Sequence, residues 1–294
     1  MLQTRYLLEF TFIFLIARFF RLFPIEIASN IGGFLGRNIM FFVCRFTGDN
    51  KKGLANLTFV FPDYSEEKKL GILRKSYENI GRLVAEYVNQ HKMNERYFKK
   101  NIEIINQKGF EDAMKNGCFG ITAHFGNWEI MQRYSNIIGT DLSVIYNPLQ
   151  NPYTNKFYLS QRKVRQIPKG SNAMKQLIEV IRAKKNVGIL IDQRDKTGEI
   201  FQFLGRDART STAIQRLALK YDYKVMSVKC MRRKDNPNKF ILEVYPSIEI
   251  EKTGDFETDV KALTNKTLEL LEDWIRKDPE NWLLWFYSRW RTKF

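Results

Sequence analysis

Two patterns of apolar and polar positions divide the chain near residue 100. Before it, apolar residues recur at spacings of three and four, which predicts helices over 6–23, 25–46 and 65–92, with 50–62 as a connection. Beyond it, short apolar runs predict strands at 102–105, 118–123, 142–146, 187–191 and 224–230. Amphipathic stretches predict helices at 110–116, 127–138, 171–184, 211–221 and 257–277. Such alternation is typical of an α/β sheet with helices on both faces.

The first segment, residues 6–23, is rich in large apolar residues but is interrupted by Glu9, Arg18 and Arg21. Its uninterrupted part, 10–17, is shorter than the ~20 residues that a spanning helix needs. No small-residue cleavage site follows it, which argues against a secretory signal. Three interpretations stay open: a marginal single-pass anchor, an amphipathic helix in the cytoplasmic interface facing anionic headgroups, or an ordinary core helix. We expect membrane association in one of the first two forms.

The candidate chemistry centres on His124, one of two histidines in the chain. An apolar strand precedes it, Gly126 allows a tight turn, and Asn127 is a suitable N-cap for the helix that follows. Glu129, in the first helical turn, could reach back to the imidazole, fix its tautomer and stabilise its protonated form. His124 would then take a proton from a hydroxyl near neutral pH.

A plainer interpretation of the same turn is also consistent with the spacing. His124 would be a half-buried residue, and Glu129 would oppose the dipole of the helix that it begins. The other histidine, His91, stands at the basic end of the helix 65–92 beside Lys92, where a solvated role is expected.

Two further clusters follow other predicted strands. The basic residues Arg162, Lys163, Arg165 and Lys169 come after the strand 142–146, in a loop and helix suited to phosphate or carboxylate groups. The plainer interpretation of that run is a solvated face. Asp192 closes the strand 187–191, where it would serve a site or pair with a neighbouring arginine.

Composition narrows the classes of partner. Lysine and arginine number 48 against 32 acidic residues, giving a net charge of +16, which suggests nucleic acid, an anionic lipid surface or a phosphorylated substrate. The 14% aromatic content favours lipid. The three cysteines are widely spaced in apolar runs, so we expect reduced core residues rather than a disulfide framework or zinc site. No glycine-rich nucleotide-binding motif is present.

Residues 124–129, HFGNWE, resemble the His-x4-Asp/Glu motif of the lysophospholipid acyltransferase superfamily, in the form typical of bacterial lipid A late acyltransferases of the lauroyl and myristoyl type. The resemblance extends along most of the chain. Further matching positions are Asn56, Leu57, Phe61 and Pro62; Asn151, Pro152, Tyr153 and Arg162; Asp192, Gln193, Gly198, Phe203, Leu204, Gly205, Ala208 and Thr210; and Pro279, Trp282, Trp285, Arg289 and Trp290. Two positions depart from the pattern: Asn147 replaces a common arginine, and Tyr287 replaces a usual histidine.

The resemblance implies a glycerolphosphate-acyltransferase-like mixed sheet flanked by helices, with an N-terminal membrane-associated helical region. Residues 1–24 would form the membrane-anchoring segment, and the helical region 25–98 would act as one functional unit with the α/β acyltransferase domain 99–294. The implied activity moves an acyl group from an acyl-carrier-protein thioester to a hydroxyl of a 3-hydroxyacyl chain on a Kdo-lipid A precursor. The implied location is the cytoplasmic face of the inner membrane. No cofactor and no metal are implied.

In this mechanism His124 is the base and Glu129 orients it. Arg162 is the candidate for contacting the oxyanion or an acceptor phosphate, with Asp192 positioning it, and Asn127 is a further candidate for substrate binding. Two alternatives stay open. One is an acyltransferase for a lysophospholipid or another glycolipid. The other is a non-catalytic basic protein that binds membranes or nucleic acid, although no recognised nucleic-acid motif is present.

Overall fold

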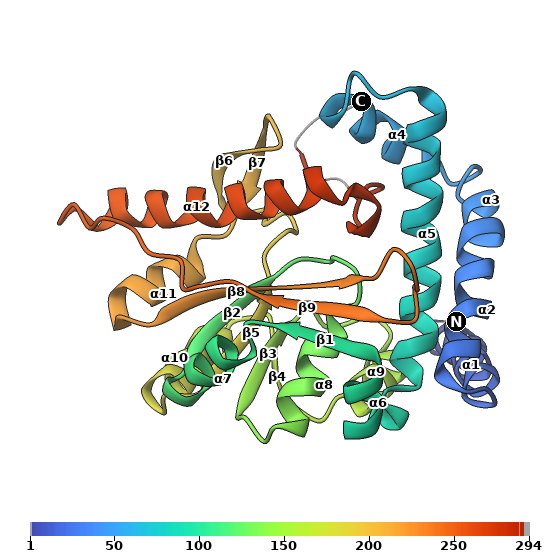
Figure 1. Ribbon diagram of the computed structural model, residues 1–294, viewed down its shortest axis with the longest axis horizontal. Coiled ribbons are helices and arrows are strands. Elements are labelled where there is room, and N and C mark those ends of the chain that lie inside the picture. The colour runs from blue at the N-terminus through green and yellow to red at the C-terminus, as the bar shows by residue number, and fades with distance from the viewer. Residues whose placement is uncertain (1, 288, 291–294) are drawn as a thin grey trace.

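The computed structural model describes residues 2–287, 289 and 290; Met1 and residues 288 and 291–294, which belong to the expected segments 1–24 and 99–294, fall outside the described residues. The fold is a mixed sheet flanked by helices, preceded by a helical N-terminal region (Figure 1). That region comprises α1 (Leu2–Arg21), α2 (Ile25–Leu35), a π-helical turn (Gly36–Met40), α3 (Phe41–Val43), α4 (Asp49–Val60), α5 (Glu66–Val88), a 3-10 turn (Gln90–Lys92) and α6 (Glu95–Asn101).

Two expectations for the N-terminal region need correction. The stretch predicted as a connection is the helix α4, which begins after Gly48 in a left-handed conformation and buries Gly53, Leu57 and Val60 at helical spacing. The predicted helix 25–46 is broken at Gly36, where the backbone widens into a π turn. At Gly36 a Cβ would collide with the carbonyl oxygen of Tyr77, so this turn lies directly against α5.

The remaining strands and helices follow in the order β1 (Ile102–Ile105), α7 (Gln107–Asn116), β2 (Cys118–Thr122), α8 (Glu129–Ile137), β3 (Leu142–Tyr146), α9 (Pro152–Ser160), β4 (Arg165–Pro168), α10 (Ala173–Arg182), β5 (Asn186–Leu190), β6 (Glu199–Phe203), β7 (Arg206–Thr210), α11 (Ala213–Tyr221), β8 (Lys224–Arg232), β9 (Phe240–Val244), α12 (Phe256–Lys277) and a 3-10 turn (Pro279–Asn281).

Seven strands form the main sheet in the order β1-β9-β8-β2-β5-β3-β4. Strands β8, β2, β5, β3 and β4 run parallel, whereas β9 is antiparallel to β8 and parallel to β1. Strands β6 and β7 pair separately as a hairpin. The basic run after Arg162 is therefore not a loop and helix as expected, because Arg165–Pro168 is the edge strand β4.

Successive side chains of β2 point to opposite faces of the sheet, and each face has its own hydrophobic core. Cys118 packs with side chains of α7 and α8, whereas Phe119 and Ile121 pack with side chains of α10, α11 and α12. Figure 1 shows α7 and α8 on one side of the sheet and α12 on the other. β2 and β5 are parallel neighbours, so their carboxyl ends lie side by side at the same end of the sheet. Both faces of the sheet are covered, so this end is where side chains that follow the two strands can meet.

Helix α1 leaves much of its apolar surface exposed, since only Ala17 and Phe20 are buried. Its exposed apolar residues are Leu2, Leu7, Leu8, Phe12, Ile13, Phe14, Leu15 and Phe19. Aromatic contacts of Phe10 and Phe14 with Phe157 attach the helix to α9. Among the described residues, no helix combines the length and apolar character needed to cross a membrane. The exposure of α1 does not fit the interpretation as an ordinary core helix.

Candidate active site

The turn between β2 and α8 has the tight geometry predicted at Gly126, but the N-cap of α8 is Trp128 and not, as expected, Asn127. Gly126 has a φ of +54°, and a Cβ there would collide with the carbonyl oxygen of Cys230. The side-chain oxygen of Asn127 accepts a 3.1 Å hydrogen bond from the backbone N–H of Glu129, where α8 begins. His124 therefore lies just beyond the strand, on a short turn held between the sheet and a helix N-terminus.

The C-terminal segment pairs with this turn through its backbone. Leu283 N–H donates to the carbonyl oxygen of His124 at 2.9 Å, and Gly126 N–H donates to that of Asn281 at 2.8 Å. Trp282, the residue between Asn281 and Leu283, is completely buried. These hydrogen bonds fix the backbone of the turn beyond Thr122, the last residue of β2.

His124 is oriented by Asp192 rather than by Glu129. Its ring Nδ1 lies 2.8 Å from Asp192 Oδ1, and its backbone N–H donates to Asp192 Oδ2 at 2.8 Å. The cause is the register of parallel neighbours: Thr122 pairs with Leu190, so the residues two positions further on come together. The sequence places Glu129 nearer to His124, but strand order brings Asp192 to it instead.

Asp192 is fully buried, and the groups around it favour the ionised form of its carboxyl. Burial alone would raise the pKa of this carboxyl, but the nearby His124 charge and three hydrogen bonds, from the ring, the indole of Trp282 and the His124 backbone, hold the pKa below its ordinary value. An ionised carboxylate only accepts hydrogen bonds, so His124 Nδ1 carries a proton toward Asp192, and in the neutral imidazole the lone pair lies on Nε2. The His124 side chain keeps 18% exposure.

Glu129 lies in a separate buried cage. Its carboxylate accepts hydrogen bonds from Arg162 at 2.5 and 3.2 Å, from Gln132 at 2.8 Å and from the indole of Trp128 at 3.1 Å. The hydroxyl of Tyr158 donates to it at 3.4 Å. Glu129 thus ties α8 to α9 and to the segment before β4.

Arg162 is paired with Glu129 and not, as expected, with Asp192. Its guanidinium also donates to the Tyr158 hydroxyl and, at 3.0 Å, to Gln166 Oε1. Burial lowers its pKa, but the charge and hydrogen bonds of Glu129 outweigh burial, so the pKa is raised above its ordinary value. The guanidinium is therefore permanently charged, and the buried carboxylate of Glu129 neutralises it. Its Nε, Nη1 and Nη2 groups already donate hydrogen bonds within the protein, and these are the donors that an oxyanion or a phosphate would need.

Trp128 and Gln193 lie against the His124 ring. Trp128 meets it edge to face, with ring centroids 4.7 Å apart. The Gln193 amide nitrogen lies 3.5 Å from His124 Nε2. Glu129 therefore reaches the imidazole only indirectly, by holding the Trp128 indole.

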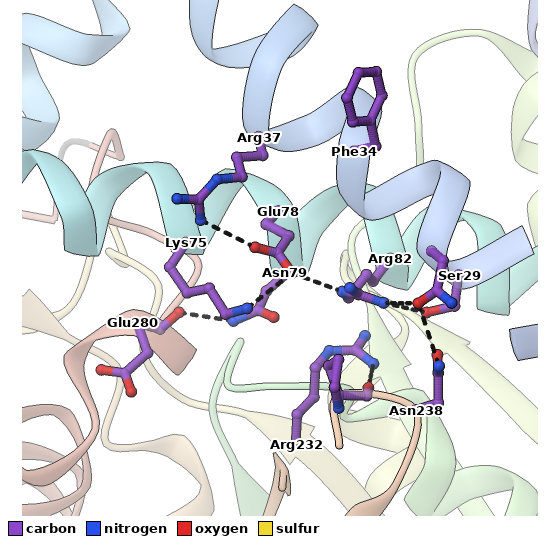
Figure 2. A network of polar contacts seen from close by, with 12 residues as sticks. Ser29, Phe34, Arg37, Lys75, Glu78, Asn79, Arg82, Arg232, Asn238 and Glu280 are labelled. Atoms are coloured by element: carbon purple, nitrogen blue, oxygen red, sulfur yellow. Dashed lines mark hydrogen bonds and ion pairs between the residues drawn. The ribbon is translucent and has the colours of Figure 1, made fainter. Parts of the chain in front are cut away.

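Asn127 is buried with both ends of its amide bonded, so the expected substrate contact does not match its position. Its nitrogen donates to Glu86 Oε2 at 2.6 Å, and Glu86 also accepts two 2.7 Å hydrogen bonds from Arg232. Ser29 donates to the same carboxylate. Figure 2 shows how this network continues along α5, where Glu78, Arg82 and Ser29 connect α5 to α2.

Sequence reasoning missed the roles of Trp282 and Tyr158. The Trp282 indole donates to Asp192 Oδ2 at 2.9 Å. Its sequence signal was its place among the C-terminal positions that match the family pattern, which does not indicate a contact with Asp192. Lys163, Arg165 and Lys169 are exposed beside Arg162, in agreement with the plainer interpretation of a solvated basic face. Within residues 2–287, 289 and 290, no cluster of three or more histidine, cysteine or acidic side chains could hold a metal ion.

Comparison with known proteins gives one family and a distant structural likeness. Residues 1–292 match the family model described as "Bacterial lipid A biosynthesis acyltransferase". Among solved structures, the 1-acyl-sn-glycerophosphate acyltransferase PlsC from Thermotoga maritima is similar, with 12% identity, a TM-score of 0.37, and coverage of 83% of this chain and 98% of that one. No curated protein matches the sequence.

Proposed function

We propose that this chain, which belongs to the family of bacterial lipid A biosynthesis acyltransferases, moves an acyl group from an acyl-carrier-protein thioester to a hydroxyl of a 3-hydroxyacyl chain on a Kdo-lipid A precursor. We place this reaction at the cytoplasmic face of the inner membrane. The observation that carries the chemistry is the His124 imidazole, whose Nδ1–H is held by the buried carboxylate of Asp192, so that Nε2 is the ring nitrogen that would accept a proton.

The reaction requires one proton transfer in each direction. His124 Nε2 takes the proton of the acceptor hydroxyl as its oxygen attacks the thioester carbonyl carbon. The carbon–sulfur bond then breaks, and the imidazolium returns the proton to the departing thiolate. Asp192 stabilises the imidazolium between these steps, and the Gln193 amide supplies a side-chain donor for the carbonyl oxygen.

Charge and exposed apolar surface support the substrates. An acyl-carrier protein is acidic and the glycolipid acceptor carries phosphates, so both suit a chain with a net charge of +16. Lys163, Arg165 and Lys169 present exposed positive charge on the segment that follows Arg162. The exposed apolar residues of α1 suit an acceptor whose acyl chains stay in the bilayer.

The test is a two-acceptor assay with full-length protein in detergent micelles. Labelled acyl-carrier protein is supplied with a Kdo-lipid A precursor or with a lysophospholipid, and mass spectrometry identifies which acceptor gains an acyl group. We expect the gain on the Kdo-lipid A precursor. His124→Ala should lower turnover by roughly 10²–10⁴-fold, whereas His91→Ala, at an exposed histidine outside the site, should retain it.

Two results would overturn separate parts of the proposal. A gain on the lysophospholipid alone would refute the acceptor while leaving acyl transfer intact. Near-normal turnover of His124→Ala on either acceptor would refute the assignment of the base.

A further inference from the structure

The carboxylate of Glu86, on α5, is buried and binds residues 124–129, the catalytic turn. Its side chain is 1% exposed. Oε1 accepts hydrogen bonds from Ser29 Oγ at 2.6 Å and from Arg232 Nη1 at 2.7 Å. Oε2 accepts from Asn127 Nδ2 at 2.6 Å and from Arg232 Nη2 at 2.7 Å. The carboxylate therefore joins α2, β8 and the catalytic turn to α5.

Arg232 fixes the orientation of this carboxylate. Its side chain is 4% exposed, and two of its nitrogens bind the two oxygens of Glu86 in parallel. Such a bidentate pair defines the plane of the carboxylate as well as its position. The guanidinium also donates to the carbonyl oxygen of Pro237 at 3.0 Å and lies 4.9 Å from the centre of the Phe240 ring. Glu86 therefore cannot rotate without breaking a buried ion pair.

Asn127 carries this orientation into the catalytic turn. Its amide nitrogen binds Glu86, and its amide oxygen accepts from the backbone N–H of Glu129 at 3.1 Å. The residue between Asn127 and Glu129 is Trp128, whose ring lies against that of His124. Loss of the acceptor at Glu86 would leave a buried amide N–H unpaired, so the Asn127 side chain would turn and release the first N–H of α8. The Trp128 ring would then shift relative to His124.

We propose that Glu86, fixed by Arg232, is a positioning residue for acyl transfer, because through Asn127 it fixes the turn that carries His124. The inference rests on the proposed function. Glu86 acts at a distance from the reacting atoms, since its hydrogen bonds go to Ser29, Asn127 and Arg232. The alternative is a purely structural role, in which the ion pair only ties α5 to β8. The two roles predict different results when the hydrogen bond to Asn127 is lost but no buried charge is left unpaired.

The experiment compares Glu86→Leu/Arg232→Met with Glu86→Gln/Arg232→Met in the full-length protein. Both double variants remove the ion pair, and replacing such a pair by neutral residues often leaves stability nearly unchanged. Only Glu86→Gln keeps an acceptor oxygen for Asn127. We expect Glu86→Leu/Arg232→Met to lose about 10²-fold in kcat with little change in KM, and Glu86→Gln/Arg232→Met to keep most of the wild-type kcat. Steady-state kinetics measures both values, and unfolding in urea measures stability.

Two further variants separate positioning from folding. Glu78→Leu/Arg82→Met makes the same substitutions in a buried pair on the same helix, with 3.0 Å between the charged groups. The hydrogen bonds of that pair go to α2, the π turn and α5, so kcat should stay at the wild-type value. Asn127→Ala removes the hydrogen bond to Glu86 from the other side. It should lower kcat by a similar factor, and it tests the link even if Glu86→Leu/Arg232→Met does not fold.

The possible outcomes separate this inference from the proposed function. Wild-type kcat in Glu86→Leu/Arg232→Met or in Asn127→Ala would overturn the inference and leave the function standing. Equal losses of kcat in the two double variants at Glu86 would also overturn it, because the acceptor for Asn127 would then make no difference. A loss confined to KM would do the same. Absence of acyl transfer in the wild-type protein would refute the proposed function, and the inference with it.

Discussion

Asp192 and Glu129 are both buried carboxylates near His124, but they bind different partners and therefore have different roles in the site. Asp192 accepts three hydrogen bonds, and two of the three donors belong to His124 itself. Glu129 is matched instead to the guanidinium of Arg162. At the residue scale, Asp192 therefore controls the protonation of the imidazole, whereas Glu129 stabilises the surroundings of the site.

The first prediction concerns Asp192→Asn. The amide has only one acceptor oxygen, and its NH2 group would face donors, so the His124 tautomer that leaves Nε2 free loses its support. We expect kcat to fall by roughly 10²–10⁴-fold with little change in KM. Steady-state kinetics with the acyl-carrier-protein donor measures both values, and circular dichroism controls for folding. A variant with normal kcat would show that Asp192 does not act on the imidazole.

The second prediction concerns Glu129→Gln, which leaves the buried Arg162 guanidinium without its counter-charge. Breaking a buried ion pair in this way costs roughly 3–5 kcal/mol, so the free energy of unfolding in urea should fall accordingly. Adding Arg162→Met should recover part of that loss, because the unpaired charge is removed. If Glu129→Gln abolishes turnover but keeps the stability of the wild type, Glu129 has the direct chemical role that the motif spacing predicts.

At the scale of elements, periodicity predicted most strands well because their sequences are short apolar runs bounded by polar residues. β1 and β3 occupy the predicted positions, and β2, β5 and β8 differ by one or two residues. It missed β4 and the hairpin of β6 and β7, where polar residues interrupt the apolar pattern, and it also missed β9.

The sequence singled out residues that the structure brings together, but it did not predict which of them pair. His124, Glu129, Arg162 and Asp192 all lie in one region, but their pairing depends on strand order, which periodicity along one chain does not contain. The spacing of His124 and Glu129 suggested a contact within the turn. The adjacency of β2 and β5, whose sequences lie 68 residues apart at the contact, supplies the actual partner.

The third prediction uses two glycines of α5. A Cβ at Gly81 would collide with the carbonyl oxygen of Gly32, so Gly81→Ala must separate α5 from α2, at a cost of about 1–3 kcal/mol. Gly71 has open space around it, so Gly71→Ala should stabilise the helix by about 0.5–1 kcal/mol. Chemical denaturation of both variants measures the two changes. Equal effects of the two substitutions would mean that the close approach of these helices does not contribute to stability.

At the scale of the whole molecule, exposed apolar side chains concentrate on the N-terminal helices. Besides those of α1, they include Ile27, Phe34, Leu35, Ile39, Phe42 and Val43. The polar side chains of this region include Arg37, which pairs with Glu78 at 3.3 Å. An apolar surface of this extent, in a chain with excess positive charge, is typical of a face that lies in the interface of an anionic membrane.

The fourth prediction follows from that surface. Replacing Phe12 and Leu15 of α1 with glutamate removes apolar area and adds negative charge, so binding to vesicles that contain anionic phospholipid should fall by tenfold or more, about 1.4 kcal/mol at the least. The loss should be measured by vesicle flotation at several salt concentrations, since the electrostatic part weakens as salt rises. Ile200→Glu, at a half-exposed position on β6, is the control and should bind as the wild type does. Undiminished flotation of the double variant would show that α1 is not the surface that contacts the membrane.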